Sequence, residues 1–375
     1  MGKKLGFGLM RLPSLDPTDA GKIDIKQCCN MVDMFLERGF TYFDTAWMYC
    51  NFKSEDAVKD ILMSRVARDR FTLTTKLHSG FISSKADRDK IFNAQREKTG
   101  AEFFDYYWLH DVNSHSVEVY DRLDCWKWIQ DKKAAGDVRH IGFSFHDGPD
   151  LLDKVLTEHP EIEFVQIALN PIDWDSELVQ ARDCYDVIRR HGREVVIMEA
   201  VKGGGLAKLP DEAEAVLRAV HPDWSIASWS VRFCLEKEGV IAVLSGMSTL
   251  DQVLDNTRTS DEAQPLTTEE HQALAEAMRI YRESAPIRQS QIEQYRGLKY
   301  HGVPVTAILQ AYSICQIQPN PGFSDDNNYL KNAFAEAEHV DFREGLERQQ
   351  VIASDGTNIT ELVEKAVSWL TENTF

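Results

Sequence analysis

The sequence predicts an α/β protein, a (β/α)8 (TIM) barrel with a helical C-terminal extension. Short apolar runs alternate with segments of helical periodicity between residues 40 and 257, which is the pattern of a parallel sheet. About seven strand–helix units follow a Gly-rich opening segment, and this many favours closure into a barrel. An open, doubly wound sheet is the alternative, but no GxGxxG follows the first strand.

The predicted elements follow one another in order. A Gly-rich apolar strand at 4–12 opens the chain, with a hairpin on the barrel floor as the alternative, and a helix follows at Ile25–Glu37. Further strands are predicted at 40–44, 71–76, 104–109, 138–144, 164–168, 194–199 and 240–244. Further helices are predicted at 54–65, 84–98, 117–135, 149–157, 177–191, from about 225, and at 250–255. Ser54 is the predicted N-cap of its helix.

Near residue 285 this alternation stops. We therefore expect a barrel at 1–285 and a helical extension at 286–375, with helices at 306–315, 328–336 and 359–370. The Pro- and Asn-rich stretch 318–328 is predicted to be a loop.

Charge and cysteine usage limit the possible partners. The net charge of -18, from 42 basic and 60 acidic residues, disfavours nucleic-acid or anionic-membrane binding. Seven cysteines without a CxxC pair indicate reduced thiols, and no signal peptide or membrane span is recognisable. We expect a cytoplasmic protein without a metal site. The sequence is compatible with a homo-oligomer and does not specify the oligomeric state.

Polar residues at three successive strand ends carry the candidate chemistry. Asp44 and Lys76 end two strands, Tyr49 follows the first, and His110 follows the third. Such ends meet at one mouth of a barrel. A phenol has a pKa of about 10, which an adjacent ammonium lowers, and a carboxylate can hold that ammonium. We therefore expect Tyr49 to deliver a proton to an oxygen as hydride reaches its carbon, with His110 orienting the carbonyl. Each residue alone is more often structural.

The second half of the chain offers groups for a dinucleotide. Ser144 and Gln166 lie at or near strand ends, and Asn170 lies in a following loop. Their side chains suit an amide such as the carboxamide of nicotinamide. Each of them is also an ordinary polar residue at a strand terminus.

Two glycine-containing segments suit phosphates. Gly203 and Gly204 follow a strand and free backbone N–H groups for a pyrophosphate. The segment 245–248 leads into a helix that carries Gln252 and Asn256, which suit an adenosine. A flexible loop and an ordinary helix cap are the alternatives.

With these residues in view, the sequence resembles the aldo-keto reductase family. The motifs are Gly-Phe-Gly-Leu-Met-Arg-Leu-Pro, Phe-Asp-Thr-Ala-Trp-Met-Tyr, Thr-Thr-Lys-Leu, Tyr-Trp-Leu-His, Gly-Phe-Ser-Phe-His and Val-Leu-Ser-Gly-Met-Ser-Thr, in the family's order. The resemblance implies the catalytic tetrad Asp44, Tyr49, Lys76 and His110. It implies cofactor contacts from Gly8, Met10, Arg11, Asp44, Ser144, Gln166, Asn170, Met198, Glu199, Val201, Gly203, Gly204, Gly246, Met247, Ser248, Gln252 and Asn256. Met198 stands where many members have an aromatic residue against the nicotinamide.

The extension resembles that of a family branch with a ferredoxin-like C-terminal part. The flanks of two cluster-binding motifs are recognisable near 302–305 and 353–359, but the cysteines are absent and only Cys315 follows residue 285. Because Fe–S clusters need several thiolates, we predict no Fe–S cluster. Segment 247–252 lacks a cation for a 2′-phosphate. Because many family members use NADPH, the resemblance implies NADPH as the cofactor, with NADH as the alternative.

These observations predict an NAD(P)H-dependent oxidoreductase that reduces a small aldehyde or ketone to an alcohol, or catalyses the reverse reaction. A sugar-like carbonyl compound is one possible substrate. A cofactor-sensing regulatory or scaffold subunit is the first alternative. A redox-neutral epimerase or lyase that keeps its nicotinamide bound is the second. The aromatic or imidazole side chains expected to line a substrate site are Trp47, Phe52, His78, Trp174 and Trp224.

Overall fold

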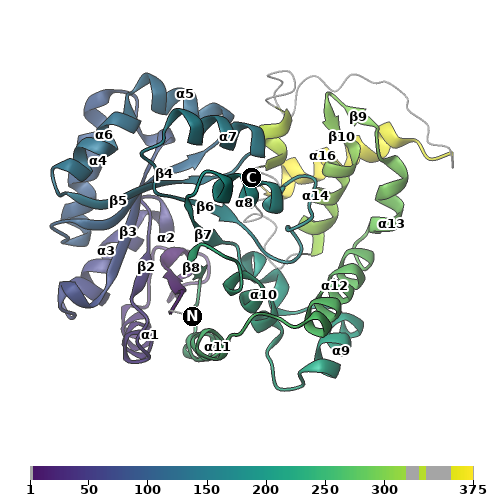
Figure 1. Ribbon diagram of the computed structural model, residues 1–375, viewed down its shortest axis with the longest axis horizontal. Helices are drawn as coiled ribbons and strands as arrows, with labels where there is room; N and C mark the ends of the chain where they lie inside the picture. The colour runs from purple at the N-terminus through teal and green to yellow at the C-terminus, as the bar shows by residue number, and fades with distance from the viewer. Residues whose placement is uncertain (1–2, 318–328, 335–355, 375) are drawn as a thin grey trace.

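The computed structural model describes residues 3–317, 329–334 and 356–374 of the chain. Eight parallel strands close into one barrel in the order β1 to β8, and helices surround it (Figure 1). The predicted (β/α)8 fold class is therefore confirmed, and the open sheet is excluded.

The opening segment supplies a strand of the barrel and not a floor hairpin. β1 (Leu5–Gly8) pairs in parallel with β2 (Tyr42–Asp44) on one side and with β8 (Val240–Ser245) on the other. The remaining strands are β3 (Thr72–His78), β4 (Phe104–Val112), β5 (Val138–Phe145), β6 (Phe164–Ala168) and β7 (Glu194–Met198). β3 and β4 run past their predicted ends, so Lys76 and His110 lie inside their strands.

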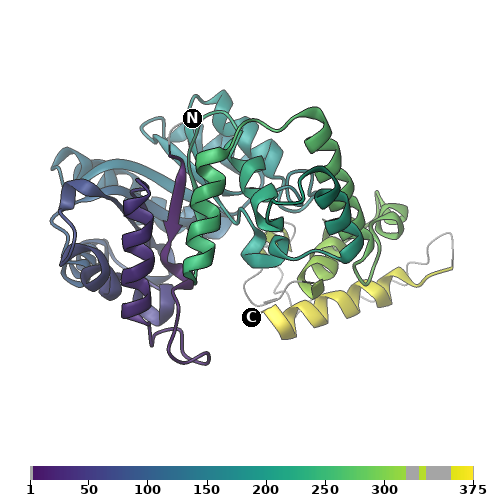
Figure 2. The same cartoon turned by 90° about the horizontal axis from the view of Figure 1, so that it is seen from below.

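Several outer helices match their predicted positions. They are α1 (Ile25–Glu37), α4 (Lys85–Thr99), α7 (Pro149–Glu158), α10 (Ile226–Leu235) and α11 (Leu250–Glu262), the last being longer than predicted. In Figures 1 and 2, α1 and α11 lie on either side of β1. Helices α9 (Asp211–Val220) and α12 (Thr268–Glu283) were not predicted.

Three predicted helices have different limits in the structure. The helix expected at 54–65 is an α-helix only over Ser54–Val58 and continues as a π-helix over Lys59–Met63. The helix expected at 117–135 is divided into α5 (Ser114–Arg122) and α6 (Cys125–Ala134), because Asp124 has a left-handed backbone with φ 56°. The helix expected at 177–191 begins only at α8 (Ala181–Arg190), after a series of turns.

The role predicted for Ser54 is also wrong. A short turn, α2 (Tyr49–Phe52), precedes α3 (Ser54–Val58), and Ser54 is the first helical residue of α3 and does not cap it. Its buried hydroxyl donates a 2.9 Å hydrogen bond to Leu9 O instead. This bond joins the segment after β2 to the segment after β1.

The lumen of the barrel has its own small core. It consists of Trp108, Phe164, Val196, Ala242 and Leu244. Two glycines make room for two of these side chains. A Cβ atom on Gly142 would lie 2.3 Å from the Phe164 ring, and one on Gly6 would lie 2.6 Å from Leu244. The lumen is therefore packed below the layer of polar residues that lies at its C-terminal end.

The extension contains α13 (Gln289–Ile292), β9 (Lys299–Tyr300), β10 (Val303–Pro304), α14 (Val305–Ile317), helical residues 329–334 and α16 (Ile359–Thr374). The antiparallel pair β9–β10 was not predicted. α14 and α16 pack side by side beyond the barrel (Figures 1 and 2). The described residues do not include the loop predicted at 318–328. Of the helix predicted at 328–336, they include only residues 329–334. No helix in the described ranges is long and apolar enough to cross a membrane.

Candidate active site

A buried ion pair lies at the C-terminal end of the barrel. Asp44, the last residue of β2, accepts a 2.5 Å hydrogen bond at Oδ1 from Lys76 Nζ on β3. The same ammonium donates to Thr45 O at 2.8 Å and lies 3.4 Å from the hydroxyl oxygen of Tyr49. Lys76 is fully buried. The structure thus brings three of the predicted catalytic residues into one hydrogen-bonded group.

Burial and mutual attraction act in opposite directions on this pair. Burial raises the pKa of Asp44 and the charge of Lys76 lowers it, with a net rise. Burial also lowers the pKa of Lys76, and Asp44 only partly opposes this. Asp44 Oδ2 has no hydrogen-bond partner in the part of the chain that the structure describes. Each charge therefore depends on the other for its stability.

The backbone after Tyr49 is strained. Cys50, Asn51 and Phe52 have φ values of 50°, 51° and 65°, a left-handed region that costs about 1–3 kcal/mol for each such residue. The thiol of Cys50 lies 3.5 Å from Leu9 O and 3.4 Å from the next carbonyl, which fixes this turn to the segment after β1. The position of the phenol is thus set by contacts that the surrounding structure imposes.

His110 lies beside the phenol. Its ring centroid is 5.9 Å from that of Tyr49, at an interplanar angle of 82°. Burial lowers the pKa of His110 well below the usual value, and Lys76 and His78 lower it further. His110 is therefore neutral at neutral pH, and its Nδ1 has no hydrogen-bond partner among the described residues. A neutral imidazole here can donate to a carbonyl oxygen.

A cavity of about 450 Å³ lies between the loops that follow β7 and β8. Its lining includes most of the residues predicted to contact a cofactor: Arg11, Glu199, Val201, Gly203, Gly204, Gly246, Met247, Ser248, Gln252 and Asn256. Gly203 and Gly204 have φ values of 61° and 100°, and a Cβ on Gly204 would meet nothing within 4 Å. The loop thus leaves its backbone open towards the cavity.

The residues present fit a dinucleotide at this cavity. The volume is within the range of roughly 300–1,000 Å³ that ligand sites occupy. The N-terminus of α11, capped by Thr249, faces the same space through its first residues. Its charged lining consists of Arg11, Glu199, Asp251 and Asp255. Carboxylates therefore outnumber guanidinium groups around the cavity.

The three predicted amide-binding residues have different surroundings. Ser144 and Gln166 are paired across β5 and β6 and are both buried. Asn170 is engaged locally: its amide donates to Asp173 Oδ2 at 2.6 Å and to Glu199 O at 3.0 Å, and its oxygen accepts two backbone N–H groups. Ser144 Oγ accepts a 2.8 Å hydrogen bond from the Asp111 N–H and keeps its own hydroxyl hydrogen for donation.

The other predicted cofactor residues border the same end of the barrel. Gly8 pairs with Asp44 across β1 and β2, and Met198 ends β7 opposite Ala168. Met10 is partly exposed in the turn after β1.

Sequence reasoning missed a buried pair beside the Gly-rich loop. Lys202 Nζ lies 2.7 and 2.8 Å from the two carboxylate oxygens of Asp173, which also accepts from Asn170. Both partners are buried. The pair links the loop after β6 to the loop after β7, and no spacing in the sequence indicated it.

The residues expected to line a substrate site divide into two groups. Trp174 packs between Tyr185 and Phe233, and Trp224 stacks on His221, so both are structural. The others come together near Tyr49: Trp47, Phe52 and His78, joined by Phe81. Sequence reasoning missed Phe81, Asp111 and His146, although Asp111 directly follows His110 and His146 ends a quoted motif.

Comparisons with known proteins agree with this architecture. The family model described as "Aldo/keto reductase family" matches residues 4–279. The 4-dihydromethyl-trisporate dehydrogenase of Mucor mucedo is 28% identical over 176 residues, or 40% of this chain and 54% of that protein. The chain thus spans about half the length of that curated relative.

Solved structures share the barrel. Aldo-keto reductase AKR11C1 from Bacillus halodurans, in its holo form, has a TM-score of 0.57 and 24% identity, covering 73% of this chain and 91% of that one. An aldo-keto reductase from Klebsiella pneumoniae in complex with NADPH has a TM-score of 0.57 and 19% identity, covering 74% and 90%. At these sequence identities, the structural similarity shows that this chain and the two solved proteins share a fold.

Proposed function

The chain belongs to the aldo/keto reductase family of NAD(P)-dependent oxidoreductases, and from this premise we propose that it reduces a small aldehyde or ketone to an alcohol, or the reverse, with Tyr49 as proton donor. The observation that carries the proposal is the contact of the buried Lys76 with both Asp44 and Tyr49. A pure scaffold would not need to bury such a pair, because a buried ion pair is weak as a source of stability.

The chain's own residues each have a role in this reaction. The hydride would come from a reduced nicotinamide bound in the cavity. Tyr49 gives its phenolic proton to the carbonyl oxygen, and Lys76 stabilises the negative charge that develops on the phenol oxygen. Asp44 keeps Lys76 charged although burial lowers the pKa of that lysine. His110, being neutral, donates a hydrogen bond that orients the carbonyl oxygen beside Tyr49.

The cofactor is proposed to occupy the cavity lined by the Gly-rich loop and the start of α11. Gly203 and Gly204 would receive the pyrophosphate, and Ser144 and Gln166 would bond the carboxamide. Asp251 and Asp255 face the cavity near the adenosine side, and Arg258 lies 3.7 Å from Asp255. A carboxylate favours a free ribose 2′-hydroxyl over a 2′-phosphate. We therefore propose that the protein prefers NADH to NADPH. This reverses the preference for NADPH that the family resemblance implied.

The extension is proposed to be a degenerate relative of the ferredoxin-like part, divided from the barrel near residue 285 and without an Fe–S cluster. Cys315 is buried within α14. Burial among apolar residues suits a packing role for this thiol.

Tyr49→Phe tests the proposal. The variant should lose at least about 100-fold in turnover of a broad panel of aldehydes and ketones, because proton transfer by a placed group contributes roughly 10²–10⁴-fold. Quenching of tryptophan fluorescence by the dinucleotide should be unchanged. Undiminished turnover by Tyr49→Phe would contradict the assignment of Tyr49 as proton donor. No turnover of any compound by the wild type would contradict the reductase function.

A further inference from the structure

We propose that a cavity between the barrel and the C-terminal extension binds a small zwitterion, an α-amino acid with an aliphatic side chain. Its carboxylate pairs with Arg282, and its ammonium group donates to Gln310 Oε1. The described residues that line this cavity include none of Tyr49, Lys76 and His110. The site therefore lies outside the reductase function proposed above and does not depend on it.

The cavity has a volume of about 280 Å³ and is formed by two parts of the chain. The barrel contributes residues 172–177, which lie between β6 and α8, and the rest comes from α12, α13, α14 and the segment between α12 and α13 (Figure 1). The volume is just below the range of roughly 300–1,000 Å³ that drug-sized ligands occupy, which suits a smaller molecule. The buried apolar side chains of its wall are Ile172, Ala285, Ile287, Ile292 and Ile314.

Arg282, on α12, supplies a cation to this cavity. Its Nη2 donates a 2.7 Å hydrogen bond to Ile172 O, and in the part of the chain that the structure describes no carboxylate lies within ion-pair distance of it. Burial lowers the pKa of Arg282, and the more distant Asp173 and Asp175 only partly oppose this. A guanidinium presents its N–H donors in a planar fork that matches a carboxylate. A ligand carboxylate would give Arg282 the anion that it lacks.

The carboxylates that line the cavity already have cations of their own. The pairs are Asp173 with Lys202, Asp175 with Arg182, and Glu177 and Glu293 with Arg296. Four lining carboxylates thus share three cations, and Arg282 is the fourth cation, so these charges balance. A ligand that carries both a carboxylate and an ammonium group keeps this balance, whereas a simple anion or cation disturbs it.

Gln310, on α14, supplies a buried acceptor. Gln289 Nε2 donates to Glu293 Oε1 at 2.7 Å. Because an ionised carboxylate only accepts, the Gln289 amide must turn its oxygen to Gln310, whose Nε2 donates to it at 3.4 Å. The orientation of the Gln310 amide is thereby fixed, and its buried Oε1 has no hydrogen-bond partner among the described residues. A buried acceptor without a donor is costly, and a ligand ammonium group would satisfy it.

An aliphatic α-amino acid combines the three groups that suit this cavity. Its carboxylate matches Arg282, its ammonium group matches Gln310 Oε1, and its side chain packs on the isoleucines of the wall. A fatty acid would leave the buried acceptor unsatisfied. An alkylamine would leave Arg282 without an anion and add a further cation beside it.

Calorimetric titration of the full-length protein compares L-leucine with two analogues. Isocaproate lacks only the ammonium group of leucine, and isoamylamine lacks only its carboxylate. We expect L-leucine to bind at least about tenfold more tightly than either analogue, because each analogue loses a hydrogen bond that involves a charged group. An analogue that binds as tightly as L-leucine, or no binding of L-leucine up to about 10 mM, would overturn the inference.

Two variants assign the binding to this cavity. Gln310→Leu should weaken L-leucine binding about tenfold and leave isocaproate binding unchanged, because isocaproate has no group for the lost oxygen. Arg282→Met should weaken the binding of both by about tenfold or more. Arg279→Met removes an exposed guanidinium from the same helix and should change neither. L-leucine binding that is equal in Gln310→Leu and the wild type would overturn the inference, whether or not Arg282→Met folds.

Discussion

Asn332, in the C-terminal extension, donates a 2.8 Å hydrogen bond from its side-chain amide to the backbone oxygen of His146, beyond the end of β5. Both residues are buried. The hydroxyl of Tyr329 lies 3.5 Å from the preceding carbonyl, that of Phe145. The extension is therefore bonded to the barrel beside the candidate active site, one residue before Asp147 and next to the imidazole that faces Asp111.

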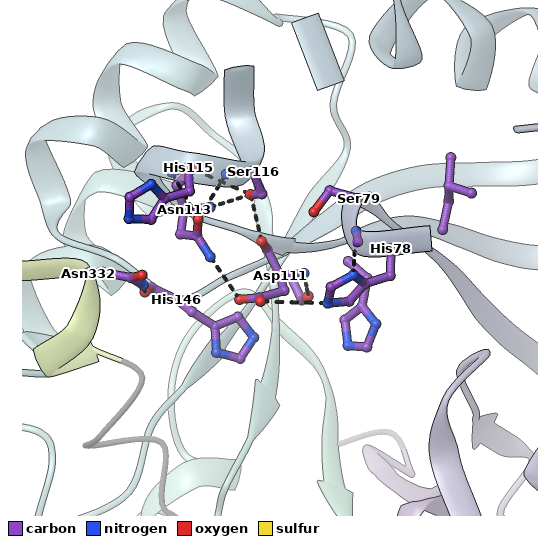
Figure 3. A network of polar contacts seen from close by, with 12 residues as sticks. His78, Ser79, Asp111, Asn113, His115, Ser116, His146 and Asn332 are labelled. Carbon is purple, nitrogen blue, oxygen red and sulfur yellow. Dashed lines mark hydrogen bonds and ion pairs between the residues drawn. The ribbon is translucent and has the colours of Figure 1, made fainter. Parts of the chain in front are cut away.

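Asn332→Leu is expected to weaken substrate binding. Leucine keeps the approximate volume but leaves His146 O buried without its donor, which costs roughly 1–3 kcal/mol. His146 should then be less well fixed beside Asp111 (Figure 3), raising KM for a carbonyl substrate several-fold with kcat nearly unchanged. Steady-state kinetics and denaturant unfolding measure the two effects. Asn93→Leu, at an exposed position of α4, is the control; an unaltered KM in Asn332→Leu would contradict the coupling.

Asp44→Asn should impair both stability and turnover. Removing one member of a buried ion pair leaves Lys76 uncompensated and costs about 3–5 kcal/mol. The lysine then loses its proton, and turnover falls by at least about 100-fold. The double variant Asp44→Asn with Lys76→Met should regain part of the stability but none of the turnover. Urea unfolding and steady-state kinetics check this, and a single variant as stable as the wild type would refute it.

Dinucleotide preference should respond to Asp251. Its carboxylate lines the cavity proposed for the cofactor, where a 2′-phosphate would meet like charge. We expect NADH to bind more tightly than NADPH, and Asp251→Asn to narrow the difference by about tenfold. Fluorescence titration measures both dissociation constants. Asp150→Asn, exposed on α7, serves as the charge-matched control, and tighter NADPH binding by the wild type would reverse the proposed order.

Stability should fall on mild acidification. Burial lowers the pKa values of His110 and His146 in the folded protein, whereas unfolded imidazoles titrate near pH 6.5. The unfolded chain therefore binds more protons below about pH 6.5, and the unfolding free energy decreases from there as the pH falls, by up to about 1.4 kcal/mol per pH unit for each imidazole. Above about pH 7 this contribution to stability is fully retained.

Urea unfolding at about pH 7, 6 and 5 measures the slope of the unfolding free energy against pH. His110→Gln should flatten it, because glutamine takes up no proton in either state. His115→Gln, at an exposed position, should leave it unaltered. A wild-type unfolding free energy that stays constant across this range would show that the two imidazoles protonate as readily in the folded state as in the unfolded one.

The convergence of Asp44, Lys76 and Tyr49 could be predicted because the C-terminal ends of parallel strands must meet at one mouth. The distance of the Tyr49 phenol from Lys76 could not be, since it depends on strained backbone after Tyr49 that only tertiary contacts maintain. The division of the helix at Asp124 has a similar origin. Arg88, from α4, donates to the carbonyl oxygens of Leu123 and Asp124 and holds that break open.

Another difference has a local signal in the sequence. Helix α12 begins with a capping box in which Thr267 and Glu270 bond one another's backbone, and this pattern is visible in the sequence. The Lys202–Asp173 pair had no such signal, because two loops from different strands supply its members. Long-range pairs of this kind follow from the fold and not from spacing.

The closure of the barrel by β1 and β8 has a consequence for how the chain folds. Leu5 lies opposite Val243 and Phe7 opposite Ser245 in the parallel register of β1 and β8, so the first strand gains its second neighbour only when the last has been made. During synthesis, at roughly 5–20 residues per second, the edges of a growing sheet stay exposed for several seconds or more. Closure is a contact of very high sequence separation, and such contacts slow folding. Ribosome-bound chains that end before β8 should therefore depend on chaperones, whereas complete chains should close and become protease-resistant.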